Sequence, residues 1–592
     1  MKRSEQKTEN CWRLEDLYET REEWEDDFKQ LEESLPKLTA HLSHIGESAD
    51  KLLAFLLLHD QCSMTAERLY VYANQKMHEN MSDTKNQAPA SRSESLMTKL
   101  NAAKAAFTPN LLHIGKQAVL EFIDELDELK NYRRYLMEFF RQEKHIRNDE
   151  IEEMLANVHE ISGGASDIFS MFNNADVIFK SILDENGNTI HLTQGNFIVC
   201  MKNKNRNIRI AAFESIYEQY EKYKNTLSAT YYANVKKEIF FAKARKYKNT
   251  LSYKLDDADI PIKVYKQLIH TVNKYLPVLH CYMATRKEAL GLDELHMYDI
   301  NVPIVDRTES KISFEEAKDM VKKGLRPLGE EYIALLQEGF DSGWIDIYEN
   351  DGKRTGAYSW GAYGVHPYVL LNFQGNLNSV FTLAHEMGHA LHSYYSDREN
   401  RYVDACYKIF VAEVASTCNE AILIHNLLAE SKDKEEKKYL LNYFIEQFRG
   451  TLFRQTMFAE FEMSAHKSAE AGEVLTPDKL SSIYYDLNRK YYGDWVCLDS
   501  QIAIEWARIP HFYRSFYVYQ YATGFSAAIA ISKKILEGDR EVLDGYMKFL
   551  KGGCTLPPIE LLKLTGVDME SAKPVEDAME MFAGLLKEFE TL

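Results

Sequence analysis

Three residues between Phe381 and Ser393 have the types and the spacing that a catalytic metal site needs. His385, Glu386 and His389 form the pattern His-Glu-x-x-His. On an α-helix, residues four apart lie on one face about one turn apart, so two imidazoles can reach one tetrahedral zinc ion while the glutamate faces the metal-bound water. The spacing therefore predicts two zinc ligands and a catalytic base on one helix.

The residues around this pattern favour a buried helix. A pattern with two free positions also arises by chance in a chain of 592 residues, so its context matters. Asn376 and Asn378 are candidate helix caps. Apolar residues follow at helical spacing, namely Val380, Phe381, Leu383, Ala384, Met387, Ala390 and Leu391. Two histidines and a glutamate on such a helix need a partner charge, which a metal ion supplies.

A catalytic zinc ion usually takes three protein ligands, so a third has to come from elsewhere. His392 shares the face of the two histidines but lies about 10 Å along the helix axis from His385, so we interpret it as packing or support. The downstream acids are Asp397, Glu399, Asp404, Glu413 and Glu420. The first three lie in a polar connection, whereas Glu413 lies in an apolar segment, where a carboxylate needs a charge partner. Glu413 is the predicted third ligand, and Glu420, two turns along the same face, is a candidate to orient a ligand histidine.

Two other functions stay open at this point. A helical scaffold or peptide-binding protein could hold a structural zinc ion, with Cys406 or Cys418 closing the fourth position. A glutamate inside the motif serves no purpose in such a site, which favours an enzyme. Among enzymes, an exopeptidase is the nearest alternative to an endopeptidase.

Composition narrows the class of protein further. The chain carries a formal net charge of -19, which disfavours nucleic acid as a partner. Its eight cysteines include no Cys-x-x-Cys pair, so we expect no disulfide framework. The polar residues 1–10 have no signal-peptide core, and the longest apolar run, Leu52 to Leu58, is too short to cross a bilayer. We therefore expect a cytoplasmic protein with no membrane partner; its oligomeric state is left open.

The pattern along the chain predicts a mostly α-helical protein in two lobes. Successive amphipathic helices up to about residue 180 give a helical N-terminal lobe, residues 1–190, and residues 191–592 form the catalytic domain. A predicted hairpin around the turn 185–188 marks the boundary. Short strands at 344–348 and 368–373, joined by a loop over 356–364, predict a small sheet beside the zinc helix. An extended peptide could pair with an exposed edge of that sheet.

Four blocks of sequence resemble the zinc oligopeptidases of the thimet oligopeptidase and neurolysin type, and among them the bacterial oligoendopeptidases F. The blocks are GAYSWGAYGVHPYVLLNF (356–373), FTLAHEMGHALH (381–392), FVAEVASTCNE (410–420) and PHFYRSFYVYQYATGFS (510–526). The resemblance covers nearly the whole chain. It implies a mostly α-helical, two-lobed metallopeptidase with a deep central channel that admits short unstructured peptides, and with one zinc ion at its floor.

The resemblance also implies roles for particular residues. His385, His389 and Glu413 would bind the zinc ion, and Glu386 would be the base that assists attack of the zinc-bound water on an internal peptide bond. In the family, a His and one or more Tyr near the C-terminus stabilise the oxyanion. His511 matches that His, and Tyr521 and Tyr517 are the candidate tyrosines. Together with Tyr513 they recur every four residues, which predicts one helical stripe.

Overall fold

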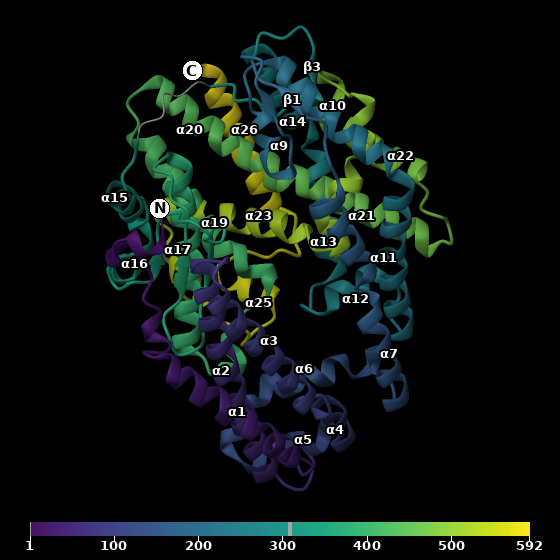
Figure 1. The fold of residues 1–592 in the computed structure, drawn as a ribbon, viewed down its shortest axis with the longest axis vertical. Helices are drawn as coiled ribbons and strands as arrows, with labels where there is room; N and C mark the ends of the chain where they lie inside the picture. The colour runs from purple at the N-terminus through teal and green to yellow at the C-terminus, as the bar shows by residue number, and fades with distance from the viewer. Residues whose placement is uncertain (1, 306–310) are drawn as a thin grey trace. The chain divides into compact units, whose positions relative to one another are not determined.

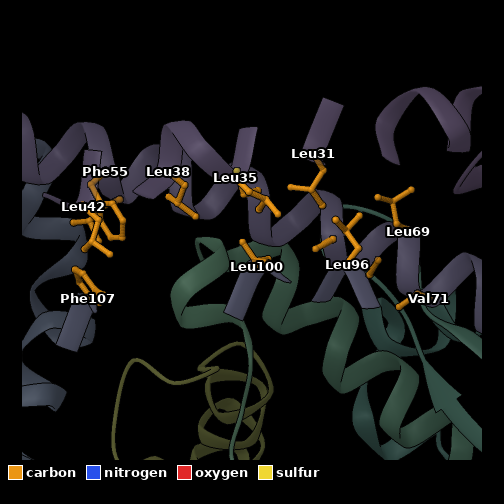
Figure 2. Packing of buried hydrophobic residues seen from close by; sticks show 14 of the residues in the cluster. Leu31, Leu35, Leu38, Leu42, Phe55, Leu69, Val71, Leu96, Leu100 and Phe107 are labelled. Carbon is orange, nitrogen blue, oxygen red and sulfur yellow. The ribbon is translucent and has the colours of Figure 1, made fainter. Parts of the chain in front are cut away.

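Helix α1 (Arg21–Leu42) shows how the sequence builds this mostly helical protein. Thr20 caps the helix by accepting a hydrogen bond from the backbone N–H of Glu23. One face of α1 is apolar and buried, through Trp24, Phe28, Leu31, Leu35, Leu38 and Leu42. This face packs against α2 (Ala49–Glu79) and α3 (Thr84–Lys104), as Figure 2 shows for its leucines. Each such side chain stabilises the fold by about 1.5–3 kcal/mol when fully buried.

The structure is a computed structural model that describes residues 2–305 and 311–592. By their contacts the residues form two compact units, each assembled from three stretches of chain. Unit 1 comprises 1–146, 309–426 and 531–567, and unit 2 comprises 147–308, 427–530 and 568–592. Neither unit coincides with the predicted N-terminal lobe, residues 1–190, or with the predicted catalytic domain, residues 191–592. That domain division stays a prediction, as does the deep central channel that the resemblance implies.

Unit 1 is mostly helical, and many of its helices are labelled in Figure 1; it also contains a small sheet. Its remaining helices are α4 (Phe107–Ile114), α5 (Lys116–Glu125), α6 (Arg133–Gln142), α15 (Phe314–Gly324), α16 (Glu330–Asp341), α17 (Leu377–Glu399), α18 (Tyr402–Ala405), α24 (Arg540–Leu550) and α25 (Pro558–Lys563). Two further helices, α19 (Ile409–Glu430) and α23 (Tyr519–Leu536), cross a boundary between the units.

The predicted sheet beside the metal helix is present in unit 1. Strand β6 (Tyr368–Leu370) pairs in parallel with β4 (Ile345–Asp346) and antiparallel with β5 (Tyr358–Trp360). Strands β5 and β6 contact α17. The strand β5 lies inside the segment predicted as a loop, because Tyr358 and Trp360 pack against the rings of Trp12 and Tyr70.

Unit 2 is also helical. Its helices are α7 (Asp149–Ser162), α8 (Gly164–Met171), α9 (Gln194–Met201), α10 (Arg206–Lys222), α11 (Lys224–Ala244), α12 (Thr250–Asp256), α13 (Ile262–Lys274), α14 (Leu276–Ala289), α20 (Lys434–Gln447), α21 (Arg454–Glu470), α22 (Pro477–Tyr492) and α26 (Lys573–Thr591). The predicted hairpin is confirmed as the antiparallel pair β1 (Ile182–Leu183) and β2 (Thr189–Ile190). A parallel pair, β3 (Leu295–His296) and β7 (Val496–Cys497), is also present. Among the described residues, no helix combines the length and the apolar character needed to cross a membrane.

Candidate active site

Helix α17 carries the His-Glu-x-x-His motif and begins where the sequence predicts. Asn376 caps it by accepting a hydrogen bond from the backbone N–H of Ser379. Its apolar residues are buried, and the helix packs against α15, α16, α24 and the sheet. The imidazoles of His385 and His389 are only partly buried, with 28% and 18% of the side chain exposed. The helix is therefore fixed on most sides while its histidine face stays accessible.

Gly388, a free position of the motif, lets helix α19 approach α17 closely. A Cβ atom on this glycine would lie 2.6 Å from Cα of Ser416 and 3.0 Å from the carbonyl oxygen of Ala415. One turn away, the buried Asn419 donates a hydrogen bond to the carbonyl oxygen of Ala384 at 3.0 Å. Any side chain at residue 388 would push the two backbones apart. Sequence reasoning missed this role, although the glycine itself was the signal.

The close packing of these helices brings the three predicted metal ligands together. Nε2 of His385 and Nε2 of His389 each lie 3.5 Å from Oε2 of Glu413. The three ligand atoms all lie within 4.8 Å of one another. In a tetrahedral zinc site with bonds of about 2.1 Å, ligand atoms are about 3.4 Å apart. Two imidazole nitrogens and one carboxylate oxygen at these separations fit a zinc ion.

Glu420 contacts the His385 ring at Nδ1, the nitrogen that faces away from Glu413. Its Oε1 lies 2.5 Å from Nδ1 of His385, which leaves Nε2 directed at the ligand group. Burial by itself would lower the pKa of His385, but the charge and hydrogen bond of Glu420 outweigh it and raise the pKa to about 9. Carboxylates in this position fix the tautomer and orientation of metal-binding histidines. Glu420 therefore has the contact predicted for an orienting residue.

The two remaining carboxylates have opposite electrostatic environments. Burial opposes ionisation of Glu413, but its hydrogen bond to His389 and the charges of both histidines lower its pKa to about 2. Burial raises the pKa of Glu386, with the nearby histidines acting against that effect. Glu413 is therefore anionic, which a carboxylate must be to bind a metal ion, whereas Glu386 has the raised proton affinity that suits a general base.

The other candidate residues, His392, Cys406 and Cys418, lie outside this group. His392 is fully buried, and its ring stacks on Tyr407 with the centroids 3.8 Å apart. Burial lowers its pKa to about 3, so it is neutral. Among the described residues, neither Cys406, which is exposed, nor Cys418, which is buried, joins the ligand group. His392 therefore packs the helix, and nothing in the group supplies a cysteine ligand.

His511, Tyr517 and Tyr521 cluster with one another in unit 2. The ring of Tyr521 lies edge-on to both partners, with centroids 6.1 Å from His511 and 5.4 Å from Tyr517. Burial and the charge of Arg514 lower the pKa of His511, which keeps it neutral. Their role at the metal site stays a prediction.

The prediction of one helical stripe through these tyrosines is wrong. A 3₁₀ turn covers Pro510–Tyr513, and α23 begins only at Tyr519. Between them Phe516 has φ of 57°, a left-handed conformation that is rare for a bulky residue. Tyr513 consequently stacks on Phe169 instead of joining the other tyrosines.

The buried Glu462 stabilises this break. Its Oε1 accepts a hydrogen bond of 2.8 Å from the backbone N–H of Phe516, and the ring of His466 packs against the Phe516 ring. Burial raises the pKa of Glu462 well above its usual range, so it is a neutral acid. The Glu462–His466 pair was not predicted, because both residues lie on α21, far from residue 516 in sequence.

Comparison with known proteins agrees with this arrangement. The profile of peptidase family M3 matches residues 199–581, and that of oligopeptidase F matches residues 110–179. The oligopeptidase PepF of Bacillus subtilis (strain 168) is 45% identical over 590 residues, covering 100% of this chain and 88% of that protein. An oligoendopeptidase F homolog of Lactococcus lactis subsp. lactis (strain IL1403) is 39% identical over 582 residues, covering 98% of this chain and 97% of that protein.

Solved structures show the same fold. A putative peptidase from Chlamydophila abortus superposes with a TM-score of 0.92 at 35% identity and covers 100% of this chain and 99% of its own. The oligoendopeptidase-F from Enterococcus faecium superposes with a TM-score of 0.77 at 36% identity and covers 96% of this chain and 98% of its own. The helical fold, the ligand group and these similarities define a metalloendopeptidase. The chain belongs to peptidase family M3.

Proposed function

We propose that this enzyme hydrolyses internal bonds of short, unstructured oligopeptides and that one zinc ion is its cofactor. His385, His389 and Glu413 are the proposed ligands, with Glu386 as catalytic base. The observation that carries the proposal is the pair of 3.5 Å separations between the histidine nitrogens and Oε2 of Glu413. The substrate class is supported by the relatives, whose names describe oligopeptidases and oligoendopeptidases.

In the proposed reaction the metal ion, Glu386 and Glu420 have separate roles. A zinc ion at this site supplies the positive charge that acidifies a water molecule and polarises the scissile carbonyl. Glu386 accepts the proton of the attacking water and later delivers it to the leaving amine. Because burial raises its pKa, the protonated form of Glu386 is accessible during this transfer. Glu420 keeps His385 in one tautomer throughout.

His511, Tyr517 and Tyr521 are the proposed donors to the oxyanion. The support is their match to the family block and their mutual packing. Both tyrosines carry a hydroxyl, and the neutral His511 keeps one N–H, so each can donate one hydrogen bond. One such donor contributes about 3 kcal/mol to the transition state, or roughly 10²-fold in kcat. Tyr521→Phe and Tyr517→Phe should separate the two candidates by kcat, with KM nearly unchanged.

The central test is the variant Glu386→Gln. We expect kcat on an internally quenched peptide to fall at least about 10²-fold while zinc content stays at wild-type level, because the base is lost and the ligands remain. Glu399→Gln, on the same helix with 49% of its side chain exposed, is the matched control and should keep full activity. Retained turnover in Glu386→Gln would remove the base assignment.

Two further measurements separate the ligand and substrate assignments. Glu413→Ala should lower zinc occupancy, and a fully loaded variant would require another third ligand. A peptide with both termini blocked should be cut internally, whereas an exopeptidase would leave it intact. The same sequence inside a folded protein should resist cleavage.

A further inference from the structure

The parallel strand pair β3–β7 in unit 2 places a histidine and a cysteine side by side. In this pair His296 lies opposite Cys497, and Leu295 lies opposite Val496. Successive residues of a strand point to opposite faces, and Leu295 and Val496 are buried. His296 and the exposed Cys497 therefore share the outer face. Residues about two hundred positions apart in sequence present two metal-binding side chains at one point.

Glu294 completes a group of three. Its Oε2 lies 3.6 Å from Nε2 of His296, and the ligand atoms of Glu294, His296 and Cys497 all lie within 4.8 Å of one another. Around a tetrahedral zinc ion, nitrogen and sulfur ligand atoms are about 3.6 Å apart. Glu294 and Cys497 are exposed, so rotation of their side chains closes the remaining gap.

The imidazole of His296 is already oriented for such an ion. Its Nδ1 lies 2.9 Å from Oδ1 of Asp499, so Nε2 faces the other two residues. The ring also stacks on Tyr298, with an interplanar angle of 11° and centroids 4.8 Å apart. A carboxylate behind a histidine and a ring held in place are the support that metal-binding histidines use.

The backbone of the ligand segment is anchored as well. Arg206 donates a hydrogen bond of 2.9 Å to the carbonyl oxygen of Glu294. Asp299 accepts one from the backbone N–H of His296, and Asp499 accepts one from that of Met297. Arg206 and Asp299 are themselves an ion pair at 2.8 Å. The ligand positions are therefore preorganised by contacts that do not need an ion.

We propose that Glu294, His296 and Cys497 form a second metal site that binds a thiophilic divalent cation such as zinc. A thiolate and an imidazole select such ions over magnesium or calcium, which prefer oxygen ligands. Binding releases the proton of the Cys497 thiol, and a water molecule fills the fourth position. The site is independent of the proposed function, because none of its residues belongs to the group around His385. An occupied site fastens β3 to β7.

The test uses full-length enzyme loaded with one equivalent of zinc and titrated with zinc or cadmium alone. We expect a second equivalent to bind, cadmium to produce thiolate charge-transfer absorption, and zinc to protect Cys497 from alkylation as read by peptide mass spectrometry. Cys497→Ser should lose all three signals and keep its peptidase activity. Cys281→Ser, an exposed cysteine of the same unit, should behave as the wild type.

Two further variants should reduce metal binding at this site without abolishing it. Glu294→Gln should lower the affinity for the second metal equivalent about tenfold. Asp499→Asn should lower this affinity too, because His296 loses the carboxylate that orients its ring. If the wild type binds only one equivalent, or if Cys497→Ser still binds the second, the proposal is overturned. These outcomes are distinct from failure of the peptidase assignment, because they are read from metal content and cysteine chemistry.

Discussion

Replacing Glu420 should weaken binding at the proposed zinc site without touching a proposed ligand. Its carboxylate lies 2.5 Å from Nδ1 of His385, on the side of the ring away from the ligand group. Outer carboxylates of this kind change metal affinity by about 10–100-fold, which corresponds to about 1.4–2.7 kcal/mol. A hydrogen bond to a charged group is worth about 1.5–3 kcal/mol, which gives the same range independently.

The two substitutions at this position should differ in size. Glu420→Ala removes both the charge and the acceptor, so we expect zinc binding about 30–100-fold weaker than wild type. Glu420→Gln keeps a carbonyl oxygen that accepts from Nδ1–H, so its loss should be about tenfold. About a fifth of the Glu420 side chain is exposed (22%), and solvent screens its charge in part. The loss of charge alone should therefore lie toward the lower end of the range of about 10–100-fold in zinc affinity.

The assay is competition for zinc between apo-enzyme and a chromophoric chelator at constant pH. Glu430→Gln, at the exposed end of the same helix, is the control and should bind zinc as the wild type does. Thermal unfolding of the apo forms shows that the helix is intact. A Kd for Glu420→Ala equal to that of the wild type would refute the orienting role.

Three further predictions concern stability. Glu462→Leu should lower the free energy of unfolding by about 1–3 kcal/mol in urea, because the backbone N–H of Phe516 loses its buried acceptor, whereas Glu462→Gln should change it little. Burial and the charge of Glu67 raise the pKa of Asp397 to about 7, above its unfolded value of about 3.9, so its contribution to stability is lost as pH rises through 7. Between pH 5 and pH 7 the group is ionised only in the unfolded chain, and each pH unit there costs about 1.4 kcal/mol. Asp397→Asn should therefore reduce the loss of stability between pH 5 and pH 8 by about 2–3 kcal/mol, and an unchanged difference would contradict the raised pKa. Leu38→Ala, in the core of Figure 2, should cost about 2–5 kcal/mol, and a loss below 1 kcal/mol would mean that the cavity collapses.

The features that sequence predicts well are those set by neighbours along the chain. The spacing of His385 and His389 is a property of one helix, and the hairpin depends on its own turn at Gly187, where φ is 81°. Glu413 is predicted as the third ligand because a lone carboxylate in an apolar segment needs a partner, and the structure places it 3.5 Å from both histidines. In each case the deciding physics acts within about one element.

The features that sequence misses depend on contacts between distant segments. The left-handed Phe516 interrupts the tyrosine stripe, and its buried partner Glu462 comes from another helix. Strand β5 (Tyr358–Trp360) forms in a glycine-rich loop because its rings pack on distant residues. The role of Gly388 becomes visible only when α19 lies beside it. The two units, each built from three separate stretches, follow no local composition signal.

Helix α24 (Arg540–Leu550) gives α17 part of its packing, and this has a consequence for biosynthesis. Phe549 lies against the ring of His392, and Asn400 at the end of α17 donates a hydrogen bond to the carbonyl oxygen of Lys551. The ribosome completes the histidine motif long before it adds these residues. If zinc binds at the proposed site, loading at full affinity should wait until these residues are added, and a nascent chain stalled before residue 540 should bind the metal only weakly.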